Sequence, residues 1–125
     1  MGTLAGKRIA VVGGSSGIGL AVARAAAAEG ADVVVASRRP ERADGLAGVK
    51  VDVTDDDSIE AAFREIGELD HLVCTAASGF PGGLLRAPVQ EVRGLMESKF
   101  WGQYRCVRAA AGRLRPGGSV TLSSG

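Results

Sequence analysis

Ten residues near the N-terminus, 11–20, constrain the fold more than any other stretch of this 125-residue chain. They read Val-Val-Gly-Gly-Ser-Ser-Gly-Ile-Gly-Leu and join an apolar run, residues 9–12, to an alanine-rich helical pattern, residues 20–29. A strand that ends in glycines and restarts as a helix gathers unpaired backbone N–H groups at the positive end of the helix dipole. The stretch therefore predicts an anion site, which in an α/β protein most often holds a nucleotide diphosphate. A plain glycine-rich turn is the simpler alternative.

Apolar β-type runs and helical patterns alternate along the rest of the chain. Strands are predicted at residues 7–12, 31–36, 49–53, 69–75 and 119–123, with a short helical segment at 40–48 and longer helices at 54–66 and 89–114. This alternation predicts an α/β fold: a Rossmann-type doubly wound parallel sheet, five strands in the order 3-2-1-4-5, with helices on both faces. Residues 1–125 are expected to form one dinucleotide-binding domain, incomplete at its C-terminal end.

Two of the predicted helices carry clear local signals. Thr54 is the predicted N-cap of the first, with Asp57 at the capping-box position and an apolar face that repeats at helical spacing to residue 66. In the second, a helical stripe predicts the core-facing side, and it places Tyr104 toward the core. Gly94 is a candidate break in this helix, and residues 116–118 are expected to end it. The stripe consists of Met96, Phe100, Tyr104, Val107, Ala111 and Leu114.

Composition excludes several classes of function. The net charge is +1 and aromatic residues make up 4% of the chain, so neither a basic nor a base-stacking surface for nucleic acid is expected. No apolar run reaches the length of a membrane span and no signal-peptide pattern is visible, so a cytoplasmic protein without membrane contact is expected. Cys74 and Cys106 are predicted to be buried reduced thiols. His71 stands without ligand-type neighbours at metal spacing, so it is assigned a structural role and no metal site is predicted.

The spacing of the glycines identifies a family resemblance. Gly13, Gly17 and Gly19 resemble the T-G-x-x-x-G-x-G motif of the short-chain dehydrogenase/reductase family, with Val12 at the threonine position. The resemblance implies that the first glycine makes the turn, that the two serines flank the phosphates and that the last glycine lets helix and strand pack closely. The cofactor-binding residues that it implies here are Gly13, Ser15, Ser16, Gly17, Ile18 and Gly19.

The second predicted strand leads into Ser37-Arg38-Arg39, about 20 residues after the glycine loop, where a dinucleotide fold contacts the adenosine ribose. An acidic residue there would accept a hydrogen bond from the ribose 2′-hydroxyl and repel a 2′-phosphate. A serine followed by two arginines favours the phosphate, because guanidinium groups bind it with several donors. The sequence therefore favours NADP over NAD. A solvated basic turn, with Glu41 as a local partner, is the alternative.

Two further stretches resemble cofactor-contacting elements of the family. Asp52-Val53-Thr54-Asp55 resembles its Asp-x-x-Asp element, whose first aspartate meets the adenine amino group; an acidic helix start is the alternative. Residues 72–77 stand where the family has Leu-Val-Asn-Asn-Ala-Gly, although both asparagines and the glycine are replaced. Because ligands bind outside the carboxyl ends of such strands, this strand end is expected to face the cofactor with Thr75, Ala76 and Ala77.

The catalytic residues of the family match this chain only in part. The family uses an asparagine on the long helix, a serine after the fifth strand, and a Tyr-x-x-x-Lys beyond it. Lys99 stands at the asparagine position, either as a proton relay of lowered pKa or as a solvated lysine. A gapless alignment puts Ser124 on the first family serine and Gly125 on the catalytic one, whereas a shift of one residue makes Ser124 the catalytic serine. No Tyr-x-x-x-Lys follows within these residues.

The resemblance implies an NADP(H)-dependent oxidoreductase that transfers hydride between nicotinamide and a small-molecule carbonyl or alcohol. This stretch by itself is expected to be inactive, because the Tyr-x-x-x-Lys is absent and the asparagine is replaced. Two alternatives remain: a non-catalytic NADP-binding or sensor module, and a fragment that needs the rest of its fold to cover the fifth strand's edge. A homo-oligomer is expected through the long-helix face of Trp101, Arg105 and Arg108, which this family commonly uses for dimers.

Overall fold

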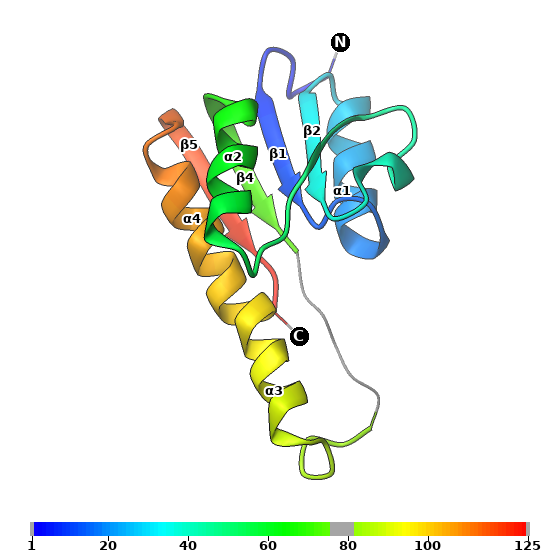
Figure 1. Cartoon of the computed structure of the whole chain (residues 1–125). Helices are drawn as coiled ribbons and strands as arrows, with labels where there is room; N and C mark the ends of the chain where they lie inside the picture. Colours follow the sequence, from blue (N-terminus) through cyan, green and yellow to red (C-terminus); the bar gives the residue numbers. More distant parts are fainter. Residues whose placement is uncertain (1, 76–81, 125) are drawn as a thin grey trace.

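The computed structural model of the chain describes residues 2–75 and 82–124. Within them, five parallel strands form one sheet in the order β3-β2-β1-β4-β5, which confirms the predicted topology (Figure 1). The crossover connections make the strand order reverse between β1 and β4, which is where ligands bind in open α/β sheets. The strands are β1 (Arg8–Val12), β2 (Asp32–Ser37), β3 (Ala47–Lys50), β4 (Leu69–Cys74) and β5 (Leu114–Leu122).

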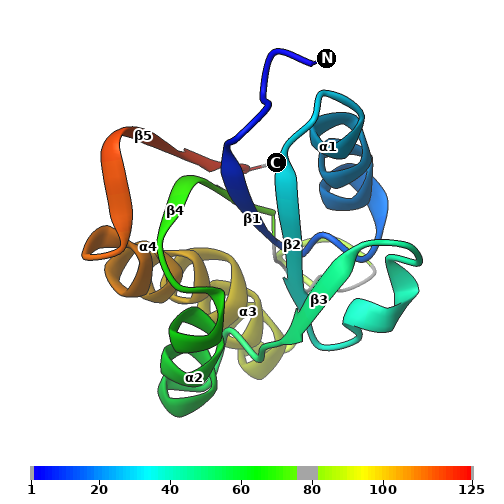
Figure 2. The same cartoon turned by 90° about the horizontal axis from the view of Figure 1, so that it is seen from above.

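Helices cover the sheet unequally on its two faces. Seen from above, α1 lies on one face, whereas α2 and α4 lie on the other (Figure 2). The line of α4 continues through a π-helical turn, η2, into α3, and this long helix extends beyond the end of the sheet (Figure 1). The helical segments are α1 (Gly17–Ala28), the 3-10 turn η1 (Pro40–Arg42), α2 (Asp56–Ile66), α3 (Val89–Met96), η2 (Glu97–Gly102) and α4 (Gln103–Ala111).

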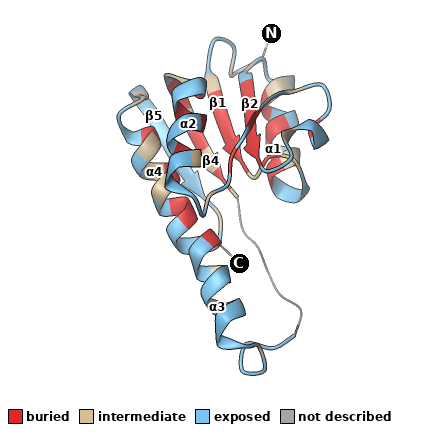
Figure 3. Ribbon diagram, viewed as in Figure 1, coloured by how far each residue is buried: buried red, intermediate tan, exposed pale blue. Residues whose placement is uncertain are grey.

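Alternate residues of the central strands build two cores. Ala10 and Val12 of β1 face the α2/α4 layer, where Phe63 is fully buried, whereas Ile9 and Val11 face α1. Strands that are apolar on both faces are typical of parallel sheets with helices on each side. Buried residues accordingly gather in the sheet and on the inner sides of its helices, whereas α3 has no buried residue (Figure 3). These cores hold the carboxyl ends of β1, β2 and β4 in fixed register.

The start of α2 differs from the prediction by one residue. The N-cap is Asp55 and not Thr54: its carboxylate accepts hydrogen bonds from the backbone N–H groups of Asp57 and Ser58. Thr54 is not free to cap because its hydroxyl donates to Asp52. The third strand is also earlier than predicted, ending at Lys50, because its pairing with β2 runs out opposite Ser37.

The predicted stripe on the long helix is wrong along its length: Ala111 is exposed like Met96, and Leu114 lies in β5 and not in the helix. Tyr104 is 49% exposed and does not point to the core, and Phe100 is also exposed. The irregularity is not a break at Gly94 but the π turn at residues 97–102, which changes which side chains face the sheet. The buried positions of this region are Ser98, Gly102, Gln103, Cys106 and Ala110.

The remaining structural expectations have mixed outcomes. Residues 116–118 do not end the helix but lie within β5, at a register irregularity against β4. Cys74 and Cys106 are buried thiols and form no disulfide with each other, as predicted, and the hydrogen bond between them and their burial raise the pKa of the Cys106 thiol. The Nδ1 atom of His71 lies 2.8 Å from the Ser119 hydroxyl.

The predictions about membranes and metals can be compared with the described residues only. Among the helices that the structure describes, none is long and apolar enough to cross a bilayer. In the same residues, no cluster of three or more His, Cys, Asp or Glu side chains could hold a metal ion. The cytoplasmic location stays a prediction.

Candidate functional site

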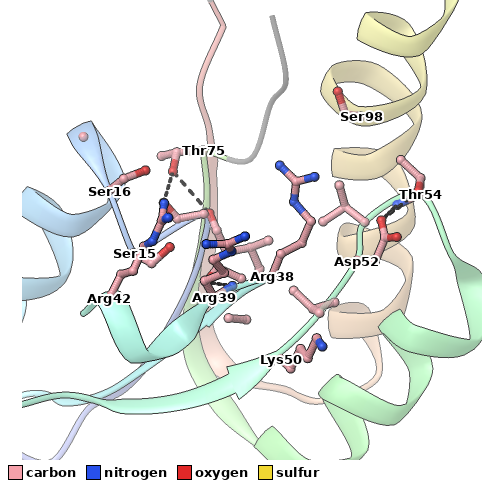
Figure 4. Close-up of a pocket in the computed structure, with 18 of the residues that line it drawn as sticks. Ser15, Ser16, Arg38, Arg39, Arg42, Lys50, Asp52, Thr54, Thr75 and Ser98 are labelled. Atoms are coloured by element: carbon pink, nitrogen blue, oxygen red, sulfur yellow. Dashed lines mark hydrogen bonds between the residues drawn. The ribbon is translucent and has the colours of Figure 1, made fainter. Parts of the chain in front are cut away.

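A cleft of about 1280 Å³ opens at the carboxyl ends of the parallel strands (Figure 4). It begins at the glycine loop after β1, crosses the ends of β2 and β3, and reaches the π turn and the residues after β5. This is where the strand order reverses and where ligands of such sheets bind. Its size exceeds the range usual for small-ligand pockets, so an extended ligand fits it better than a compact one.

The glycine loop positions the start of α1 over the end of β1. Gly13 has φ of 82°, a backbone conformation that residues with a Cβ rarely adopt, and its N–H donates to the Ala36 carbonyl at 2.8 Å. A Cβ on Gly19 would overlap the Gly13 carbonyl oxygen, so the helix approaches the loop as closely as the backbone permits. The close packing that the resemblance implied for Gly19 is therefore present.

The first turn of α1 is free to bind an anion. Its N-cap, Ser16, makes no side-chain capping bond, and no acidic residue lies in this turn. The first N–H groups of a helix have no intrahelical acceptor, and they carry the positive end of the dipole. Ser15 and Ser16 both line the cleft beside these groups (Figure 4). Together they form a neutral, donor-rich cradle for phosphate oxygens.

Thr75 ties the loop to the central strand. Its N–H donates to the Val12 carbonyl at 2.8 Å, and its hydroxyl lies within hydrogen-bond distance of the Val12 and Gly13 carbonyls, at 3.2 and 3.3 Å. The two hydroxyl contacts appear as dashed lines from Thr75 in Figure 4. The residue therefore supports the loop from β4, in addition to lining the cleft as predicted.

Four basic side chains line the cleft beyond β2. Arg38 and Arg39 were predicted to do so, whereas Arg42 from η1 and Lys50 from β3 were missed (Figure 4). Arg42 lies on a 3-10 turn whose direction only the fold determines. Lys50 pairs in register with Ser37 on the adjacent strand. Lys50 was missed because the end of this strand was predicted three residues too late, at residue 53. The serine itself is nearly buried, and its Oγ accepts from the Arg39 N–H at 3.2 Å.

Asp52 lies next to this basic group, after β3. One of its carboxylate oxygens, Oδ1, accepts from the Thr54 N–H at 2.9 Å and from the Thr54 hydroxyl at 2.7 Å. These hydrogen bonds, aided by Arg38, hold the pKa of the carboxyl below its usual value. The carboxylate is therefore charged at neutral pH, and its second oxygen remains an acceptor for a ligand amino group. Val53 and Thr54 line the cleft beside it.

The far end of the cleft is formed by the long helix and the end of β5. Ser98 and Lys99, on the π turn, line it together with Ser123 and Ser124. Ser98 is buried, and its hydroxyl donates to the Leu95 carbonyl at 3.1 Å. The π turn can pack closely against the segment after β3 because Gly102 has no Cβ. A Cβ at this position would lie 2.8 Å from Val53 Cγ2. Ser98 is a cleft residue that the sequence reasoning missed.

The structure thus brings nearly all the predicted site residues to one cleft. Ala76 and Ala77 lie outside the described residues. Gly13, Ser15, Ser16, Gly17, Ile18, Gly19, Ser37, Arg38, Arg39, Asp52, Val53, Thr75, Lys99 and Ser124 all line the cleft.

A family model described as enoyl-(acyl carrier protein) reductase matches residues 12–124. The chain belongs to the short-chain dehydrogenase/reductase family. The 3-oxoacyl-[acyl-carrier-protein] reductase MabA of Mycobacterium avium is 35% identical to it over 109 residues, which are 84% of this chain and 43% of that protein. This short-chain dehydrogenase/reductase chain therefore spans less than half the length of that curated relative.

Solved structures of the same family superpose on the fold. BdcA in complex with NADPH has a TM-score of 0.83 at 28% identity, covering 95% of this chain and 52% of that one. A short-chain dehydrogenase from Burkholderia cenocepacia J2315 in complex with NADP has a TM-score of 0.82 at 30% identity, covering 94% and 54%. This chain is thus an oxidoreductase-family Rossmann fold, and it covers about half of each of these structures.

The residues present fit a nicotinamide dinucleotide. The Gly13–Gly19 contact brings the start of α1 to the cleft, with no side-chain cap from Ser16, where a diphosphate needs backbone amides. Beyond β2, basic side chains surround a serine, and the one acidic neighbour among the described cleft residues, Asp52, is already bonded to Thr54. A dinucleotide with an additional phosphate at its ribose matches this distribution of charge.

Proposed function

We propose that this chain binds NADP(H) as the cofactor-binding part of a short-chain dehydrogenase/reductase that acts on a small-molecule carbonyl or alcohol. The observation that carries the proposal is the pairing of a neutral glycine-loop cradle with a group of four cations at the end of β2 and β3. The NADPH and NADP named for two structural neighbours support it. Family membership supports oxidoreductase chemistry.

The cofactor would lie along the cleft in an extended form. The amides of residues 17–19 would hold the diphosphate, with the hydroxyls of Ser15 and Ser16 beside it. Ser37, Arg38 and Arg39 would bind the 2′-phosphate, with charge-assisted hydrogen bonds from the guanidinium groups. Asp52 would accept a hydrogen bond from the adenine amino group, with Val53 against the ring, and Thr75 would face the nicotinamide end.

The substrate end would use side chains of the far wall. When bound, the nicotinamide supplies or accepts the hydride. Ser124 would donate a hydrogen bond to the substrate oxygen, which stabilises negative charge developing there. Lys99, at the far wall beside Ser98, would hold a proton for relay to that oxygen. The residue that exchanges the substrate proton in this family, the tyrosine of Tyr-x-x-x-Lys, does not follow within these 125 residues.

A second candidate function is NADP binding without turnover. Lys99 at the family's asparagine position favours it, because a lysine cannot accept the hydrogen bonds that an amide oxygen accepts. The two candidates share the cofactor site and differ only in whether hydride leaves it. A screen of carbonyl substrates with NADPH separates them when it is run on a protein that also carries the Tyr-x-x-x-Lys part of the family fold, because these 125 residues lack it. In that protein, the binding module gives saturable NADPH binding and no oxidation.

Cofactor titration of the purified chain tests the proposal. We expect NADPH to bind more tightly than NADH, followed by nicotinamide fluorescence. Arg38→Ala should weaken NADPH roughly ten-fold or more, because a charge-assisted bond contributes about 1.5–3 kcal/mol, and should leave NADH nearly unchanged. Arg93→Ala, which removes the same charge from exposed α3 outside the cleft, is the matched control. Binding of neither cofactor by folded protein would refute the proposal.

We also propose homo-oligomerisation through the long helix. Phe100, Trp101 and Tyr104 form an exposed aromatic cluster there, with edge-to-face ring contacts at centroid distances of 4.9 and 5.9 Å. Arg105, which was expected on this face, is instead engaged within the chain by Asp56 and Glu97. Trp101→Ser should lower the mass seen in sedimentation equilibrium if this cluster is the interface. An unchanged mass would exclude it.

A further inference from the structure

The residues after β5 have limited support from the sheet. β5 lies at the edge of the described sheet, paired only with β4, and it ends at Leu122. One further ladder bond, from the Ser123 N–H to the Cys74 carbonyl at 3.1 Å, continues the pairing. Ser124 follows, is exposed, and lines the far end of the cleft. A serine that must meet a ligand with hydrogen-bond accuracy needs its backbone held from another side.

Gln103 supplies a contact on that other side. It is the first residue of α4, only 5% exposed, and its Nε2 donates to the Ser123 carbonyl at 3.0 Å. Burying a glutamine amide is unfavourable unless it is hydrogen-bonded, so this side chain is committed to the bond. The carbonyl of Ser123 and the N–H of Ser124 belong to one planar peptide unit. The bond from Gln103 therefore acts directly on the peptide that carries Ser124.

The π turn explains why Gln103 can reach this carbonyl. Ser98 and Gln103 are five residues apart, which in a regular α-helix separates them by about 140° around the axis. In a π turn the backbone bond links residue i to i+5, so both residues lie on one side. Both are buried, and Ser98 and Lys99 line the cleft from the same turn. The turn thus places Ser98 and Lys99 at the cleft and directs Gln103 to the carbonyl of Ser123, and such turns are frequent at functional sites.

We infer that Gln103 is a positioning residue, which holds the Ser123–Ser124 peptide so that Ser124 faces the nicotinamide end of the cleft. The inference rests on the proposed function, because it assigns Ser124 a partner in the bound cofactor and substrate. Gln103 does not touch the reacting atoms and acts through the peptide alone. Removal of its donor should leave the affinity of the distant adenosine end unchanged and should release Ser124.

Backbone NMR of the isotopically labelled chain tests this inference. In the free protein, a through-hydrogen-bond coupling between Gln103 Nε2 and the Ser123 carbonyl carbon is expected, and its absence would overturn the inference without any variant. On titration, NADP⁺ should shift the Ser124 amide signal, whereas 2′,5′-ADP, which lacks the nicotinamide, should shift the signals of residues 37–39 and not that of Ser124.

Three variants separate positioning from general stability. Gln103→Met keeps the length of the side chain without a donor, and Gln103→Glu places a negative oxygen against the carbonyl. Both variants should abolish the shift of the Ser124 signal on NADP⁺ binding. In the free protein, the glutamate should displace the Ser124 signal more than the methionine does. The dissociation constant of NADP⁺, measured from the Arg38 signal, should change less than about three-fold. Gln90→Met, on exposed α3, should leave both unchanged.

The outcomes distinguish the inference from the function on which it rests. A full Ser124 response in Gln103→Met, with cofactor bound, overturns the inference and leaves the proposed function standing. No response to NADP⁺ at residues 37–39 of the unaltered chain overturns the proposed function. In that case, the coupling between Gln103 and Ser123 still decides whether the glutamine holds the peptide.

Discussion

Gly19, in the first turn of α1, lies against the backbone of Gly13 with no room for a Cβ between them. The contact brings the N-terminus of the helix directly over the end of β1. It therefore determines how far the free amides of the helix project into the cleft. The absence of a Cβ on Gly19 therefore controls the geometry of the proposed phosphate site.

Replacement of Gly19 by alanine should damage both binding and stability. The added methyl group must displace the Gly13 carbonyl, and overpacking of this kind costs about 1–3 kcal/mol. We expect a lower midpoint in chemical denaturation and a loss of NADPH binding of roughly ten-fold or more. Gly94→Ala is the control: its Cβ would meet open space on α3, and alanine should stabilise that helix by up to ~1 kcal/mol. Normal NADPH affinity in Gly19→Ala would contradict the role of this contact.

Lys50 should contribute to the preference for NADPH. It lies beside Ser37 at the end of β3 and is exposed, so its interaction with a phosphate is screened by solvent. An exposed ion pair contributes up to ~1 kcal/mol, so Lys50→Ala should weaken NADPH by about two- to five-fold and leave NADH unchanged. The salt dependence of NADPH binding should also become shallower. Lys7→Ala, exposed and outside the cleft, should change neither quantity.

Asp70 should make the stability of the chain depend on acid pH. The Arg8 N–H bonds its carboxylate at 2.8 Å and Arg115 lies 3.0 Å away, and these contacts hold the pKa of Asp70 below its usual value. A carboxyl whose pKa is lower in the folded state stabilises the fold above its unfolded pKa of about 3.9. That stabilisation is lost as the pH falls from there through the folded pKa.

Urea denaturation between pH 2 and 7 checks this prediction. Asp70→Asn should lower the free energy of unfolding at pH 7 and flatten its fall below pH 4. The exposed Asp44, for which no hydrogen bond or ion pair is described, provides the matched control as Asp44→Asn. Parallel curves for the unaltered chain and Asp70→Asn would show that Asp70 contributes nothing to the acid transition.

The order of the sheet follows from signals that are local in the sequence. Each parallel strand is a short apolar run, because it is buried on both faces, and each helix pattern between two runs forces a crossover. The glycine loop is also local, since Gly13 and Gly19 are only six residues apart and act on the same turn. For this reason the topology and the close glycine turn could both be predicted from the sequence.

The details that depend on contacts between distant segments could not be predicted in this way. Thr54 and Asp55 are equally suitable N-caps by residue type, and the choice falls on Asp55 because Asp52 engages the threonine. Tyr104 follows the period of a regular α-helix and is nevertheless exposed, because the π turn just before it changes which side chains face the sheet. Periodicity assumes one regular helix and carries no information about such a turn.

The sequence by itself determined the α/β topology, the glycine turn between β1 and α1 and the arginines after the second strand, because each arises from neighbouring residues. Only the tertiary structure decided that Arg42 and Lys50 join those arginines at the cleft, and that Gln103 meets the carbonyl of Ser123. Gln103 and Ser123 are 20 residues apart, on a helix and beyond a strand. Their contact depends on how α4 packs against the sheet, and no local pattern encodes that packing.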